Sequence, residues 1–366
     1  MISRLLTGSL RLGLATGLLA ALPWAWAQSP PAAVDWRTAN DGVGQFRRGH
    51  ADVLRWEQSR QSLDSGQAAV LPSLQLASAA DAVRLAWQAH RELVHPLARL
   101  APSDVERIAS GRWLELDPAL SARIEHFDDL IEIAAQARKA WIEAVASQLI
   151  AAQMEQSQAA AQVADELGAR MVSVGNWGRL QQAQVQLARH SADADLRRAR
   201  YQAVQAQASL IQHLQLNGIH ASVGLPDQLP ELPEQSLSAG QIQQHLARSQ
   251  AWLPPAQRMK HLASALVAPE AYLASHAIAR AAREAHKVSA LITDETQLHY
   301  NGMLKSSWDL LAAAQNQHRA AAAALAAQRD FELAQVDLQW LLLGGEPDSF
   351  VNLGAGSANA ASSAGH

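Results

Sequence analysis

Apolar residues recur at steps of three and four along two long stretches of the chain, and this spacing predicts long amphipathic helices. Proline is absent between Pro118 and Pro226 and again between Pro269 and Pro347. The longest helix is expected over 119–172, where the apolar seam is typical of a coiled coil. At about 1.5 Å per residue, such a helix would form a rod of roughly 80 Å. The seam consists of Leu120, Ile124, Phe127, Ile131, Ala134, Trp141, Val145, Leu149 and Ala152.

Glycines mark the places where the chain is expected to reverse. Gly175 opens a helical run that closes at Gly218, and Gly302 opens a second run that closes at Gly345. Each run spans 43 positions, and their starts lie 127 residues apart. The pattern therefore predicts an all-α fold built from duplicated long antiparallel coiled-coil hairpins.

The two returning helices carry apolar residues that we expect to pack against the helix before each of them. In the first, the expected seam follows a seven-residue spacing through Leu180, Leu187, Ala194, Tyr201 and Ala208. In the second, the inward residues are expected to be Leu304, Leu311, Leu325, Leu333, Val336, Trp340 and Leu343.

Shorter elements are expected before the first hairpin. An amphipathic segment over 35–60 carries Trp36, Phe46 and Trp56 on one stripe. A helix is expected from Ser78 or Asp81 to His95, where Pro96 would end it. The residues 96–118 that follow contain three prolines and a glycine, and they predict irregular structure.

The second half is punctuated by prolines. Residues 217–234 are expected to be an extended linker, with Asn217 and Gly218 capping the preceding helix. Helices should resume near Ser238, break at Pro254-Pro255, and resume again from about Pro269 to Tyr300. The Ala-, Ser- and Gly-rich tail is expected to be disordered.

These boundaries divide the chain into five parts. They are an export signal over 1–27, an N-terminal helical segment over 28–72, a first helical repeat over 73–225, a second over 226–346, and a tail over 347–366.

The first 27 residues are expected to be an export signal. Arg4 and Arg11 supply the positive start, an apolar run follows from Leu12 to Leu22, and Ala25-Trp26-Ala27 fits a cleavage site. The alternative is a membrane anchor, which would need about 20 apolar residues. Without the two arginines the formal net charge changes from −4 to −6, which argues against nucleic acid as a partner. A chain with a signal and no cysteine suits a bacterial periplasm.

Two pairs of segments resemble a known family. Residues 174–184 read VGNWGRLQQAQ and 302–315 read GMLKSSWDLLAAAQ. Residues 199–218 read ARYQAVQAQASLIQHLQLNG and 328–345 read QRDFELAQVDLQWLLLGG. They resemble the TolC-like outer-membrane efflux family, whose two halves share an alanine-to-leucine step before a closing glycine. Here that step is Ala206 to Leu210 and Ala334 to Leu338.

The resemblance implies a site. In that family the hairpin turns form the periplasmic tip of a trimeric helical tunnel and dock against the hairpins of an adaptor protein. Val174, Gly175 and Asn176 match the first tip, and Gly302 matches the second, where Asn301 replaces the expected valine. The alternative is that both glycines serve only the chain reversal.

The chain departs from the family pattern in one respect. Each half of a TolC-like protein has membrane strands with about 9 to 11 residues of alternating character. Neither 96–118 nor the region before Pro269 shows this alternation. The expected fold is therefore a TolC-like periplasmic helical domain without an evident β-barrel, in a chain located in the periplasm or at the outer membrane.

No pattern indicates catalysis or a cofactor. The sequence has no phosphate-binding glycine loop, nucleophile elbow or zinc motif. His90 and His95 are five residues apart, which does not suit one metal ion on a helix, so the 14 histidines are expected to lie on the surface. The acidic group around Asp128 and Asp129 is expected to be a solvated face.

Two functions follow from these patterns. The first is a non-enzymatic component of an envelope efflux or export system that docks to a periplasmic adaptor, as a possible homotrimer. The second is a soluble periplasmic helical scaffold or binding protein that conducts nothing.

Overall fold

The computed structural model describes residues 73–217, 219–220, 222–253, 255–347 and 349–353. Within these ranges the chain consists mainly of long helices packed together, so the expected all-α class is confirmed. The expected export signal, the N-terminal segment over 28–72 and the end of the tail from residue 354 lie outside the described residues.

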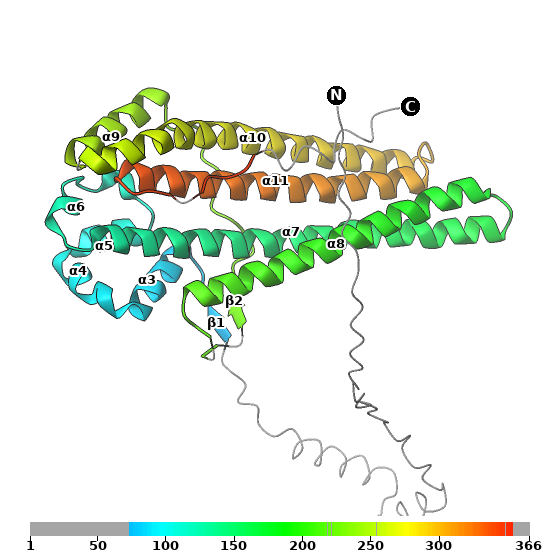
Figure 1. Cartoon of the computed structure of the whole chain (residues 1–366). Coiled ribbons are helices and arrows are strands. Elements are labelled where there is room, and N and C mark those ends of the chain that lie inside the picture. The colour runs from blue at the N-terminus through cyan, green and yellow to red at the C-terminus, as the bar shows by residue number, and fades with distance from the viewer. Residues whose placement is uncertain (1–72, 218, 221, 254, 348, 354–366) are drawn as a thin grey trace, which may run out of the picture. The chain divides into compact units, whose positions relative to one another are not determined.

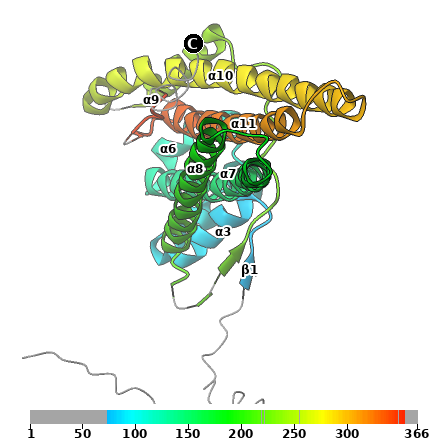
Figure 2. The same cartoon turned by 90° about the vertical axis from the view of Figure 1, so that its right-hand side faces the viewer.

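Four long helices form the body of the described structure (Figure 1). They are α7 (Phe127–Ser173), α8 (Arg179–His213), α10 (Pro255–Asn301) and α11 (Ser307–Leu342). A short turn joins α7 to α8, another joins α10 to α11, and each pair packs together. The pairs meet through α7 and α11, so the main contacts follow the order α8, α7, α11, α10. Figure 2 shows this order from the end, with α10 above α11 and α7 beside α8.

The longest helix starts later than its apolar seam predicts. A short helix α6 (Leu120–Arg123) ends at Ile124, whose backbone is extended, and α7 begins only at Phe127. Between them His126 adopts a left-handed conformation with φ of 58°, which interrupts a helix. The expected continuous rod over 119–172 is therefore wrong at its start. Ile124 and Phe127 are still buried, because a seam constrains burial and not backbone continuity.

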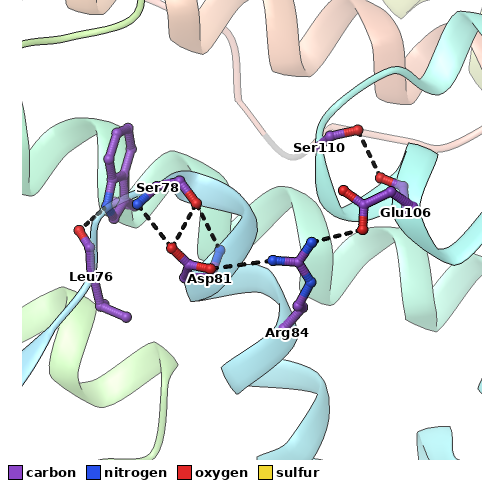
Figure 3. Close-up of polar contacts among 7 residues, drawn as sticks. Leu76, Ser78, Asp81, Arg84, Glu106 and Ser110 are labelled. Atoms are coloured by element: carbon purple, nitrogen blue, oxygen red, sulfur yellow. Dashed lines mark hydrogen bonds and ion pairs between the residues drawn. The ribbon is translucent and has the colours of Figure 1, made fainter.

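Helix α3 (Ala79–Ala89) packs against α7 and is fixed at its first turn by a capping box. Ser78 accepts a hydrogen bond from the Asp81 backbone, and the Asp81 carboxylate accepts from the Ser78 backbone at 3.1 Å. Arg84 then bridges the carboxylates of Asp81, at 3.2 Å, and Glu106, at 2.7 Å, which connects α3 to α5 (Pro102–Ala109) (Figure 3).

The region expected to be irregular after Pro96 is largely helical. Helix α3 ends at Ala89, and Pro96 lies in the first turn of the next helix, α4 (Val94–Arg99), where a backbone N–H is not needed. Pro102 likewise begins α5. A 3₁₀ turn over Trp113–Glu115 completes the segment, and another over Arg91–Leu93 precedes α4. Prolines here start helices and do not end them.

Helix α10 also begins before the expected position. The helix α9 (Ala239–Trp252), which is capped by Ser238, is as predicted, and the expected break at Pro254 lies outside the described residues. However, α10 starts at Pro255 and continues through Pro269. Proline inside a helix removes one backbone hydrogen bond. Burial of neighbouring residues offsets that loss, since Ala265, Ala268 and Tyr272 all lie in the core beside Pro269.

Two three-residue strands form a parallel pair that joins the start of the first helical repeat, 73–225, to its end. β1 (Ser73–Gln75) pairs with β2 (Ser222–Gly224), and Leu74 lies opposite Val223. The sequence did not predict these strands, because three residues are too few to show alternation. The expected cap at Asn217 and Gly218 is also wrong, since α8 ends at His213, with Leu214 as its capping residue, and the left-handed residue is Gln215, with φ of 51°.

The core of the described residues has two parts. The larger cluster lies between α3, the 100–124 region and the first half of α7, and the smaller lies between α9, α10 and α11. Among the described helices, none combines the length and apolar character that a membrane span requires.

Candidate partner-docking site at the helix turns

The turn after α7 is a Schellman motif with glycine at its left-handed position. The Gly175 N–H donates to the Val172 carbonyl at 3.0 Å, and the Asn176 N–H donates to the Met171 carbonyl at 2.9 Å. Gly175 has φ of 78°, which explains the choice of glycine. A Cβ added there would meet no atom within 4 Å. The predicted turn at Val174, Gly175 and Asn176 therefore exists, and its outer side is open.

The turn after α10 makes the same two hydrogen bonds, but its left-handed residue lies one position after the predicted Gly302. The Met303 N–H donates to the Tyr300 carbonyl at 2.9 Å, and the Leu304 N–H donates to the His299 carbonyl at 2.8 Å. The left-handed residue is thus Met303, with φ of 60°, and not Gly302. Gly302 occupies the position equivalent to Val174, so the expected match between Gly175 and Gly302 is wrong.

This geometry changes the spacing between the two turns. Residues 175 and 303 are equivalent, 128 positions apart, as are the helix-capping residues Gly178 and Ser306. The alanine-to-leucine steps at 206–210 and 334–338 share this spacing. Gly175 and Gly302 lie only 127 residues apart, because glycine holds the left-handed position in the first turn but not in the second. The 128-residue spacing of the alanine steps, added to 175, identifies Met303.

The two turns lie at the same end of the long helices and touch through an aromatic pair. The rings of Trp177, before α8, and Trp308, in the first turn of α11, have centroids 4.2 Å apart. Gly168 of α7 lies beneath them, and a Cβ there would come within 3.3 Å of Trp177 and 3.6 Å of Trp308. The absence of a side chain at Gly168 makes room for both rings.

Around this aromatic pair the turns present apolar side chains to solvent. The exposed fraction is 67% for Val174, 94% for Met303 and 75% for Leu304. Leu304 was expected to face inward, but it lies in the turn, outside α11. Asn176 and Gly302 are exposed on the same turns. The turn surface, defined here as 174–176 and 302–304, is therefore mainly apolar and uncovered.

The seven-residue stripe on α8 points away from α7. Leu180, Leu187 and Tyr201 are 73%, 72% and 68% exposed, whereas Ala192 and Leu196 are buried. The expected inward seam of this helix is therefore wrong. Polar contacts hold much of the α7–α8 pair, including the Arg189 to Asp165 ion pair at 2.7 Å and the Gln158 to Asp193 hydrogen bond at 2.9 Å.

A similar uncovered stripe runs along α10. Its exposed members recur at steps of four and three, the spacing of a coiled-coil seam. They are Ala274, Ile278, Ala281, Ala285, Val288 and Ile292. Because α8 and α10 stand at the two ends of the helix order, the described unit has an apolar edge on each side.

Charged residues join α7 to α11 far from the turns, and sequence reasoning missed them. Lys139 donates to Asp337 at 2.7 Å, and the Asp337 side chain is almost fully buried.

Burial raises the pKa of Glu332 to about 7, although the Arg138 guanidinium favours the ionised form. The Arg138 guanidinium packs directly against Gly111, and a Cβ at residue 111 would overlap it. The sequence did contain a signal for this charged contact, because Arg138 interrupts the otherwise apolar seam of the long helix.

The described residues offer no metal centre. No group of three or more histidine, cysteine, aspartate or glutamate residues there could hold an ion. His90 is engaged with Glu92 at 2.7 Å. Two histidines are buried, contrary to the expectation of surface positions: His261 bonds to the Leu341 carbonyl and His276 to the Pro233 carbonyl. Asp128 and Asp129 are exposed, as predicted.

Comparison of the sequence with models of protein families and with curated proteins finds no match.

Proposed function

We propose that the chain is a TolC-like component of a bacterial envelope efflux or export assembly that docks to a periplasmic adaptor through its two turns. The observation that carries this proposal is the turn surface. Both turns lie at one end, the Trp177–Trp308 contact holds them together, and Val174, Met303 and Leu304 are exposed around it.

The chemistry of the turns suits a helical hairpin as the partner. Each turn is narrow, and Gly175 has open space where a side chain would stand, so a partner backbone can approach closely. Exposed apolar residues at the tip supply the buried contact area that a complex needs. No catalytic group is required for this role.

The two apolar edges support assembly of several copies. The edge on α8 and the edge on α10 belong to opposite ends of the helix order, so one copy can place its α10 against the α8 of the next. Such head-to-tail contacts close into rings when the rotation permits. We propose a homotrimer of this kind, with the turn surfaces gathered at one end and the chain exported by the signal over 1–27.

A photocrosslinking residue at Met303 or Val174 tests the docking role. In cells that produce the full chain, each position is expected to crosslink to an adaptor protein that contains a helical hairpin, identified by mass spectrometry. The control position is Val94, which is 61% exposed on α4 at the opposite end of α7. Crosslinks to the same protein from Val94, or none from either turn, would contradict the proposal and favour a scaffold that conducts nothing.

A further inference from the structure

A cavity of about 780 Å³ lies between α7, α8, α11 and the segment after α11. Its volume falls within the range of small-molecule sites. Figure 1 shows α11 alongside α7, with α8 crossing α7 obliquely. Residues 349–352 close one side of it. The cavity is separate from the turn surface and plays no part in the proposed docking.

The floor of the cavity carries five charged side chains from α7 and α11. Lys139 and Asp337 form one close pair at 2.7 Å. Arg329 pairs with Asp330 at 2.7 Å and lies 3.8 Å from Glu143. Three carboxylates thus share two cations, so the floor has a surplus of negative charge.

Glu143 is the carboxylate with the weakest compensation. Among the described residues, the only cation within 4 Å of Glu143 is Arg329, which Asp330 holds more closely. Lys139 also acts on Glu143, but it is paired with Asp337. The Glu143 side chain is 40% exposed. Its partial burial raises its pKa, the Arg329 charge opposes that effect, and Asp330 adds to it. A second positive charge beside Glu143 would therefore stabilise its ionised form.

The other walls suit the uncharged part of a ligand. Trp340, Phe350 and Leu333 contribute aromatic and apolar surface. Gln202 and Gln205 of α8 line the opposite side and supply amide oxygens. Aromatic faces attract organic cations as well as apolar groups.

We propose that this cavity binds an organic cation that carries an aromatic or apolar group, with its positive charge beside Glu143. The cation would balance the third carboxylate, and its apolar part would lie against Trp340 and Phe350.

Benzyltrimethylammonium is a suitable probe because its charge does not change with pH. Isothermal titration calorimetry on the full chain at pH 8 is expected to show binding of this probe. Glu143→Gln is expected to weaken binding by about tenfold, the size of one charge contact. Phenylacetate, which has the opposite charge, is expected not to bind.

Glu155→Gln is the matched control, since Glu155 lies on the same helix, outside the cavity, and pairs with Arg200. It is expected to bind the probe like the unchanged chain. Circular dichroism and thermal melting establish that each variant is folded. Equal affinity of Glu143→Gln and the unchanged chain, equal binding of phenylacetate, or no binding of the probe would overturn the proposal.

Discussion

At the scale of single residues, the two turns show that glycine is not required for this type of chain reversal. Both turns make the same pair of hydrogen bonds, yet one places glycine and the other methionine at the left-handed position. A methionine there is unfavourable by about 1 kcal/mol or more. Its side chain is 94% exposed, so contacts within the described structure do not account for it.

The two glycines should respond differently to alanine. Gly175→Ala is expected to lower the free energy of unfolding by about 1 kcal/mol, because its left-handed φ strains any side chain. Gly302→Ala is expected to be neutral or stabilising by up to about 1 kcal/mol, because Gly302 is not left-handed and a Cβ there would meet atoms at 3.6 Å or more. Urea unfolding of both variants measures the difference. Equal losses at the two positions would contradict this assignment.

Glu332 should make stability depend on pH. Its folded pKa of about 7 is above the ordinary value of 4.5, so its stabilising effect is full below pH 4.5 and is lost as the pH rises through 7. Glu332→Gln is expected to keep a more constant free energy of unfolding between pH 5 and 8 than the unchanged chain. Urea unfolding at several pH values tests this. Asp337 and Glu143 also titrate with raised pKa values, so the difference between the two curves is the decisive quantity.

At the scale of elements, the Trp177–Trp308 contact connects the two helix pairs at their turns. An aromatic pair of this kind contributes about 0.5–1.5 kcal/mol beyond its burial. A double-mutant cycle with Trp177→Ala and Trp308→Ala is therefore expected to give a coupling energy in that range. Trp252, which is 54% exposed on α9, is the control partner. Additive effects of Trp177→Ala and Trp308→Ala would show that the turns are not coupled through these rings.

The sequence predicted the elements better than their ends and partners. Spacing at threes and fours located the long helices, and glycine located both turns to within one residue. Proline was misleading, because Pro96 and Pro102 lie in first turns, and burial around Pro269 sustains α10 through it. Periodicity shows that one face of a helix is apolar and does not show what covers it. For that reason the stripe through Leu187 and Tyr201 was assigned to the wrong side of α8.

The same limit applied to the candidate site. The resemblance located the turns through Val174 and Gly175, but it could not determine which residue of the second turn is left-handed. The contact of Trp177 with Trp308 joins residues 131 positions apart, and nothing local in the sequence indicates it. The charges of the α7–α11 contact also come from distant segments, so only the three-dimensional arrangement identifies them as pairs.

At the scale of the whole molecule, the described helices leave two apolar edges uncovered, and head-to-tail assembly would cover both. One charge on either edge should then prevent growth of the assembly. Tyr201→Glu on α8 and Val288→Glu on α10 are each expected to give monomers in light scattering after size exclusion, while the unchanged chain forms the larger species. Both residues are exposed in the single copy, so circular dichroism of each variant is expected to show the helical content of the unchanged chain.

Mixing the two variants separates head-to-tail assembly from symmetric pairing. A Tyr201→Glu copy keeps its α10 edge and a Val288→Glu copy keeps its α8 edge, so the mixture has one intact interface and is expected to form a one-to-one dimer that grows no further. If two α10 edges paired with each other instead, Tyr201→Glu alone would dimerise and Val288→Glu would stay monomeric. A monomeric unchanged chain at micromolar concentration would contradict both modes, and the turn surfaces would then have to dock from single copies.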